Sequence, residues 1–209
     1  MKTGMANKKP WLGLTLVMML LAGCSDTPKP VTAKQPEKAP EPVTGRQAFQ
    51  MMYPQARRWA ADAQPFQLRS IHLSQVKSKK GTAGAWQAIF VSPSQGKSRT
   101  YTYSAVEAEG NLHEGVFGSI EEGYTPQASS SPFLIAAIRT DSDQAYDTAA
   151  EKSQEYIKKN PGKPISFLLE LTNRYPDVTW RVIWGESVGT SDYSVFVDAS
   201  TGALLGIVH

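Results

Sequence analysis

The hydrophobic positions that follow residue 46 recur with the spacing of an amphipathic helix. They are Phe49, Met52, Ala56, Trp59 and Ala63. Just before them, Thr44 and Gln47 have the spacing of a capping box, in which two side chains satisfy the first free backbone groups of a helix. Pro54 interrupts the run, so we expect a kink there or two short helical pieces.

The pattern then changes from helical to alternating. Four segments of alternating or continuous apolar residues predict four strands: 66–76, 84–91, 99–106 and 112–120. In the third of these, Tyr101, Tyr103 and Ala105 fall on one face, because successive strand residues point to opposite faces. Gly110 and Asn111 predict the turn into the fourth strand.

The second half of the chain repeats this order. Residues 141–160 are expected to form a helix, with Asp141 and Asp143 as favourable acids at its N-terminus and lysines near its C-terminus. Four further strands are predicted at residues 165–171, 179–184, 193–197 and 203–208.

The two halves also share spacings. Gln47 lies 39 residues before Trp86, and Gln144 lies 36 residues before Trp180. We therefore predict an α+β fold of two tandem units, residues 46–124 and 133–209, each a helix packed on an antiparallel sheet of about four strands. The alternative is two unrelated α+β segments whose spacings agree by chance.

Residues 1–23 are predicted to be an export signal. Three lysines precede an uncharged apolar stretch, residues 11–22, which ends in Leu21-Ala22-Gly23-Cys24. A charged start, a short apolar region and small residues describe a signal peptide. Twelve residues are too few for a membrane-spanning helix, which needs about 20.

The Leu-Ala-Gly-Cys tetrapeptide resembles the lipobox of bacterial lipoproteins. The resemblance implies that residues 1–23 are removed and that Cys24 carries lipid on its sulfur and its new amine. Ser25 stands where an Asp would favour retention in the inner membrane, which implies sorting to the outer membrane, facing the periplasm. In a bacterium that has a single membrane, the same signal implies the outer face of that membrane. Residues 24–45 are rich in proline and poor in apolar residues, which predicts an extended linker.

The net charge of +3 does not indicate a nucleic-acid partner. Residues 1–23 contain three lysines and no acid, so their removal lowers the 22 basic side chains to 19, equal to the 19 acidic ones. A neutral domain lacks the basic footprint of a nucleic-acid-binding protein. Cys24 is the single cysteine, so the domain has no disulfide and depends on an apolar core.

The C-terminal segment resembles the PepSY family. Trp180 and Val182 begin the resemblance, which continues through Tyr193, Val195, Val197 and the Asp198-Ala-Ser-Thr-Gly202 turn. It covers residues 141–209; residues 46–120 match less well, because Glu107-Ala-Glu-Gly110 departs from the Asp-Ala-x-Thr-Gly form. The family occurs in peptidase propeptides and envelope proteins, which implies binding or restraint of a peptidase and no catalytic residues.

Catalytic and metal-binding patterns are absent from the sequence. His72, His113 and His209 have no partner at zinc-ligand spacing, and there is no phosphate loop or nucleophile motif. The Glu121-Glu122 pair is better explained as solvated residues than as a catalytic pair. We therefore predict no cofactor, no metal and no enzymatic activity, with a hydrolase as the least favoured alternative.

The sequence favours a protein- or peptide-binding module of the cell envelope, which restrains a peptidase or assists envelope assembly. Trp184, Tyr101 and Tyr103 are candidate groove-lining aromatic residues for a peptide that adds a strand at a sheet edge. Core packing is the alternative role for these rings. A small-ligand or lipid carrier, with a dry pocket between helix and sheet, is the alternative function.

Overall fold

The structure, a computed structural model, describes residues 39–209. These residues belong to one compact unit. The predicted signal peptide, Cys24 and most of the linker lie outside the described residues, so the structure does not bear on them. No helix within residues 39–209 is long and apolar enough to cross a bilayer.

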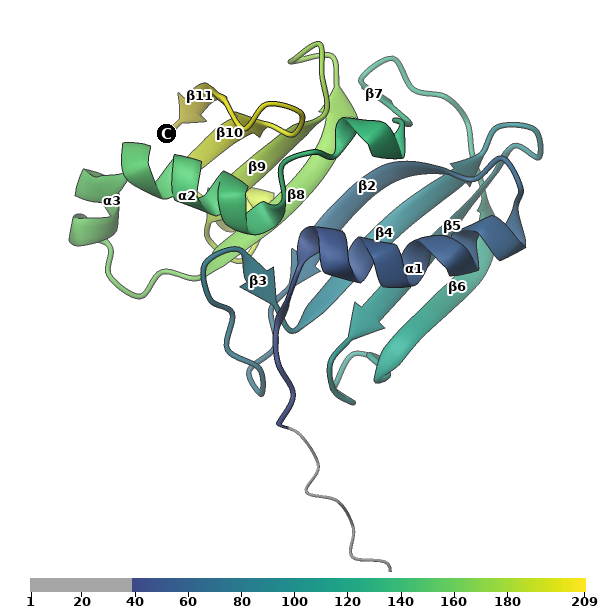
Figure 1. The fold of residues 1–209 in the computed structure, drawn as a ribbon, viewed down its shortest axis with the longest axis horizontal. Coiled ribbons are helices and arrows are strands. Elements are labelled where there is room, and N and C mark those ends of the chain that lie inside the picture. Colours follow the sequence, from purple (N-terminus) through teal and green to yellow (C-terminus); the bar gives the residue numbers. More distant parts are fainter. Residues whose placement is uncertain (1–38) are drawn as a thin grey trace, which may run out of the picture. The chain divides into compact units, whose positions relative to one another are not determined.

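The described chain contains one large antiparallel sheet and few helices (Figure 1). In chain order the elements are β1 (Val43–Thr44), α1 (Gly45–Trp59), β2 (Gln64–Ile71), β3 (Thr82–Ala83), β4 (Ala85–Ser92), β5 (Lys97–Ser104), β6 (Gly115–Gly123), β7 (Ser130–Ser131), η1 (Ile135–Ala137), α2 (Ser142–Lys152), α3 (Gln154–Lys159), β8 (Ile165–Thr172), β9 (Thr179–Trp184), η2 (Val188–Thr190), β10 (Ser194–Asp198) and β11 (Leu204–Val208). The predicted α+β class is confirmed.

Both helices begin where the sequence predicts, but their interiors differ from the prediction. Thr44 caps α1 through a capping box with Gln47, as predicted. The helix continues through Pro54, so the prediction of two pieces is wrong. Pro54 and Gln50 are both exposed, so water can satisfy the Gln50 carbonyl that lacks its usual donor.

The second predicted helix is divided into two. Asp141 caps α2 through a capping box with Gln144. The helix stops at Ser153, which separates α2 from α3. The Ser153 hydroxyl accepts a buried hydrogen bond from the Tyr193 hydroxyl at 3.0 Å. This bond ties the point where the helix is interrupted to a residue 40 positions further along the chain.

All eight predicted strands are present and join into a single sheet; β9 has the predicted bounds, and the other seven differ at one or both ends. The sheet order is β11-β10-β9-β8-β2-β4-β5-β6. The prediction placed about four strands under each helix; instead, β2 and β8 pair antiparallel and make one continuous sheet. The short strands β1, β3 and β7 were not predicted.

Helices α1 and α2 lie on the same face of this sheet (Figure 1). Helix α1 packs mainly on β4 and β5, and α2 packs on β9 and β10. Between helices and sheet lies the main core, whose largest fully buried side chains include Trp86, Trp180 and Trp184. We call the opposite face, which carries Arg69, Leu168 and Arg181, the open face.

Two of the buried tryptophans join the helix starts to the sheet. The Trp86 Nε1 donates to the carbonyl of Val43 at 3.0 Å, and the Trp180 Nε1 donates to the carbonyl of Thr140 at 2.9 Å. Each carbonyl belongs to the residue just before a helix cap. The indole N–H groups thus find partners while their rings stay in the core.

Candidate functional site

The candidate aromatic residues from the sequence lie in the core. Trp184 is 1% exposed and Tyr101 is 4% exposed, whereas Tyr103 is half-buried. The Tyr101 hydroxyl donates to the Gln55 carbonyl of α1 at 3.3 Å, and burial raises the pKa of both Tyr101 and Tyr103. Their packing is that of core residues that face the helices.

The structure also does not bring these three residues together. Trp184 is on β9, whereas Tyr101 and Tyr103 are on β5, and three strands separate β9 from β5 in the sheet. The ring of Trp184 contacts Tyr156 and Tyr193 instead. A peptide-binding role for these aromatic residues therefore stays a prediction, and the exposed surface suggests another site.

The junction between β2 and β8 is the shortest pairing along the path of eight long strands. Three residue pairs join these strands: Gln67–Glu170, Leu68–Leu169 and Arg69–Leu168. At the next position in register, the side chain of Ser70 replaces the strand pairing, because its Oγ accepts the N–H of Phe167 at 2.9 Å. Beyond this bond the two strands separate.

The separation has a local cause on β8. Ser166 is the next residue of β8 on the side where the two strands separate. Its hydroxyl donates to the carbonyls of Gly185 and Glu186 at 2.8 Å and 3.0 Å. These bonds tie β8 to the loop after β9, on the side away from β2. On the other side, β2 stays paired with β4 as far as Ile71. Each strand is thus held to its own outer neighbour.

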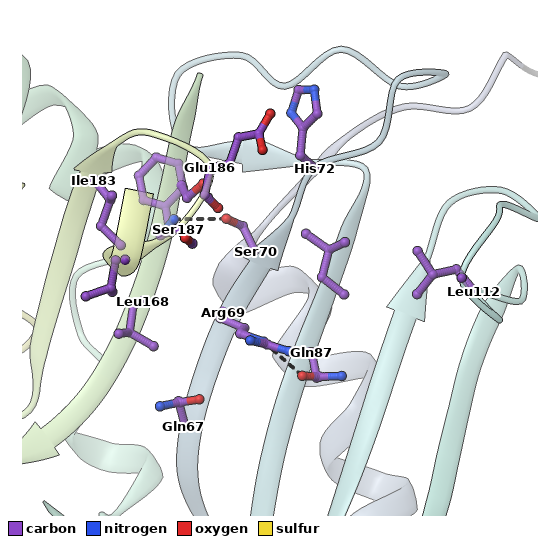
Figure 2. A pocket seen from close by; sticks show the side chains of 16 residues that line it. Gln67, Arg69, Ser70, His72, Gln87, Leu112, Leu168, Ile183, Glu186 and Ser187 are labelled. Carbon is purple, nitrogen blue, oxygen red and sulfur yellow. Dashed lines mark hydrogen bonds between the residues drawn. The ribbon is translucent and has the colours of Figure 1, made fainter. Parts of the chain in front are cut away.

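The fork between β2 and β8 opens into a groove on the open face, which we call the fork groove (Figure 2). Its volume is ≈ 820 Å³, within the range of ligand-binding clefts. Leu168 and Ile183 provide its apolar side, and Ile71 lies on β2 opposite them. Loop residues 186–189 and the hairpin residues Gly110 and Leu112 form its outer walls.

Polar side chains in the fork groove are unequally distributed. Figure 2 shows Glu186 and His72 toward one end, and Arg69, Gln87 and Gln67 further along the strands. The Arg69 Nε donates to the Gln87 Oε1 at 2.9 Å, and the Gln67 Nε2 donates to the Glu170 Oε2 at 3.2 Å. The groove therefore combines an apolar side with a guanidinium and two amides.

The outer edges of the sheet are less suited to pairing with another chain. Strand β6 has a bulge opposite Thr100, where Ile120 is 81% exposed, and it carries Glu121 and Glu122 just before its last residue, Gly123. Strand β11 is only five residues long. Bulges, charges and short length all hinder edge-to-edge association, so the interior fork is the better candidate for an extended segment.

One feature of the sequence points to the fork groove, although the alternation of polar and apolar residues does not reveal it. Phe167, Leu168 and Leu169 are consecutive apolar residues, which is typical of a strand covered on both faces. Leu168 is indeed 9% exposed although it faces away from the helices. Arg69 and Gln87 gave no signal, because their importance arises from a pairing between strands about 100 residues apart.

No family model, no curated protein and no solved structure matches the chain. The lipobox and PepSY resemblances therefore stay predictions from the sequence. Within residues 39–209 no group of three or more histidine, cysteine or acidic side chains is placed to hold a metal ion. His113 is paired with Glu107 at 2.7 Å on the surface.

Proposed function

We propose that this protein is a lipid-anchored, non-enzymatic binding module of the bacterial cell envelope, and that it binds an extended segment of another envelope protein in the fork groove. The observation that carries this proposal is the separation of β2 and β8 after three residue pairs. It leaves strand backbone beside an apolar surface, and extended peptides commonly bind by adding backbone hydrogen bonds to such strands.

The filled core favours a peptide-binding module over a carrier that holds its ligand between helix and sheet. Trp86, Trp180 and Trp184 are buried there at 0%, 0% and 1% exposure, together with Met52 and Phe90. Side chains already occupy the space that such a carrier would keep for its ligand. The fork groove itself has the volume for a small amphipathic molecule, so a periplasmic ligand carrier is the second candidate.

The membrane anchor in this proposal rests on Cys24. Acylation at the lipobox would place two or three chains on this residue, which is enough for stable anchoring. The residues from Ser25 to the start of the fold would then act as a spacer at the outer membrane, facing the periplasm. The last residues of the predicted linker, Val43 to Gly45, belong to β1 and α1.

We further propose that the fold arose from two PepSY-like units, each a helix followed by four strands. Three correspondences support this duplication. Both helices begin with a capping box that ends in Gln47 or Gln144. A tryptophan of each unit's second long strand bonds the residue before the cap. The first long strands, β2 and β8, pair with each other across the centre of the sheet. A PepSY origin is compatible with restraint of a peptidase or with a role in envelope assembly.

The test of this function is crosslinking in intact cells, followed by purification of the tagged full-length protein and mass spectrometry. We expect one dominant envelope protein in the crosslinked sample. If no protein is enriched over an untagged control, and extraction instead recovers a lipid or small molecule, the carrier function replaces the one proposed here.

A further inference from the structure

Arg69 is held in place at the fork groove while part of its guanidinium stays available. Its Nε donates to the Oε1 of Gln87 on β4, which directs the group toward that strand. None of the ion pairs among the described residues includes Arg69, and the side chain is exposed. Its two Nη atoms therefore remain as a pair of donors in a planar geometry that matches a carboxylate.

A second guanidinium lies on the same face of the sheet as Arg69. Across the sheet, Arg69 pairs with Leu168, and Leu168 pairs with Arg181, so two guanidinium groups flank one leucine on the open face. Strand spacing separates their strands by about 10 Å. Glu170 is the one acid on the paired stretches of these three strands, and it already accepts a bond from Gln67. Arg181 lies over the ring of Phe196 on β10 and does not line the groove, and it interacts with Glu170. Arg69 is therefore the guanidinium that makes this end of the groove complementary to an anion.

The shape of the groove indicates where such an anion would lie on a bound chain. At Arg69 and Leu168 the fork is closed by strand pairing, whereas it opens beyond Ser70 and Phe167. A segment that enters the fork as an added strand must leave the plane of the sheet or terminate near Arg69, because β2 and β8 pair from there on. Glu186 lies toward the open end, where it disfavours a second carboxylate (Figure 2).

We propose that Arg69 binds a carboxylate of the segment that occupies the fork groove, and that the bound partner is an extended peptide with its acidic group at the closed end. The closed end fits a chain terminus better than an internal acidic residue. This inference rests on the proposed peptide-binding function and adds the chemical group that is recognised. The Arg69 guanidinium is available for a bidentate, charge-assisted contact.

The test uses three pools of random hexapeptides passed over the full-length protein, purified in detergent and immobilised. The first pool has free C-terminal carboxylates and no acidic residues. The second has the same sequences as C-terminal amides. The third consists of amides with one internal aspartate. Retained peptides are quantified by mass spectrometry for the native protein and for Arg69→Gln. The matched control is Arg58→Gln, at an exposed position of helix α1.

We expect a carboxylate pool to be retained about 10- to 100-fold more than the pool without carboxylates. Arg69→Gln should remove this difference, Arg69→Lys should keep part of it, and Arg58→Gln should leave it unchanged. Preference for the first pool identifies a chain terminus, and preference for the third identifies an internal acid. Equal retention of all pools, or a preference that survives Arg69→Gln in a folded variant, overturns the proposal. If the proposal fails in this way but the protein still crosslinks one envelope protein in cells, only the carboxylate contact is wrong and the proposed binding function stands.

Discussion

The rings of Trp86 and Trp180 meet edge to face at the start of both helices, with their centroids 6.3 Å apart and their planes at 73°. Each indole also bonds the carbonyl just before a helix cap. The two helix starts contact each other here, because the Gly45 N–H donates to the Ser142 hydroxyl at 2.7 Å. This contact joins the two halves of the fold on the helix side, as the β2–β8 pairing joins them within the sheet.

Gly45→Ala should destabilise the protein, although alanine usually stabilises a helix relative to glycine. A methyl group at Gly45 would lie 2.7 Å from Trp180 Cη2 and 3.2 Å from Trp86 Cη2. Overpacking of this kind costs about 1–3 kcal/mol of the free energy of unfolding. Urea denaturation followed by tryptophan fluorescence measures the change.

The control for Gly45→Ala is Gly123→Ala, because no atom lies within 4 Å of the position where its methyl group would be. Its stability should remain within about 0.5 kcal/mol of the native value. A stabilising effect of Gly45→Ala would show that the helix starts do not pack as tightly as described.

Trp184→Ala separates a core role from a binding role for this side chain. Trp184 is 1% exposed between β9 and the helices, so its removal should cost about 3–5 kcal/mol of stability. Ile120→Ala, at a side chain that is 81% exposed, should change stability by less than about 0.5 kcal/mol. Loss of partner binding by Trp184→Ala without a loss of stability would instead support the groove role inferred from the sequence.

The Asp192 carboxylate should titrate far below its ordinary range. Lys163 Nζ and the Tyr156 hydroxyl both donate to its Oδ1, at 2.6 Å and 2.7 Å, and they lower the pKa to about 2. Because the folded-state pKa is lowered, this interaction stabilises the fold above the unfolded-state pKa of about 4 and is lost as the pH falls toward 2. NMR titration of the aspartate carboxyl carbons measures the pKa directly.

Lys163→Met should raise the pKa of Asp192 toward its ordinary value, because the hydrogen bond from Lys163 is the main cause of the shift. Lys152→Met removes an exposed lysine that pairs with Glu151 instead, so it should leave Asp192 unchanged. An Asp192 pKa near 4 in the native protein would contradict the described contacts.

Cys24→Ser should release the protein from the membrane fraction, because serine offers no thiol for the lipid. Ser25→Asp should leave lipidation intact and move the protein from the outer to the inner membrane in a bacterium with both. Fractionation and labelling with a clickable fatty acid measure both effects. A Cys24→Ser protein that stays in the membrane and carries label would refute the lipoprotein assignment.

The sequence predicted those parts of the fold that depend on local patterns. Neighbouring residues determine the capping boxes at Thr44 and Asp141 and the positions of the strands. They also determine the turn at Gly202, whose φ is 76°. The sequence alone did not decide whether Pro54 would divide α1, because the effect of a proline on a helix depends on whether the freed carbonyl reaches water; the helix is continuous there. The break at Ser153 depends on Tyr193, 40 residues away.

The candidate site could not be predicted because it arises from long-range pairing. The fork groove exists because Ser70 and Ser166 both form bonds that divert the strands at the β2–β8 junction. No local pattern gives the register of two strands so distant in sequence. Periodicity correctly places Tyr101 and Tyr103 on one face of their strand, but it does not distinguish a face covered by helices from a face that is free to bind.

The central claim, that the fork groove binds a segment of an envelope protein, is tested most directly by residue-specific photocrosslinking in cells. A photoreactive phenylalanine derivative replaces Val188, which is 41% exposed at the groove wall, or Met51, which is 39% exposed on α1. Both positions are similarly accessible, but only the first lies at the groove. We predict a discrete crosslinked protein from Val188 and none from Met51. The same protein captured from both positions, or from Met51 alone, would contradict the assignment of the binding site to the fork groove.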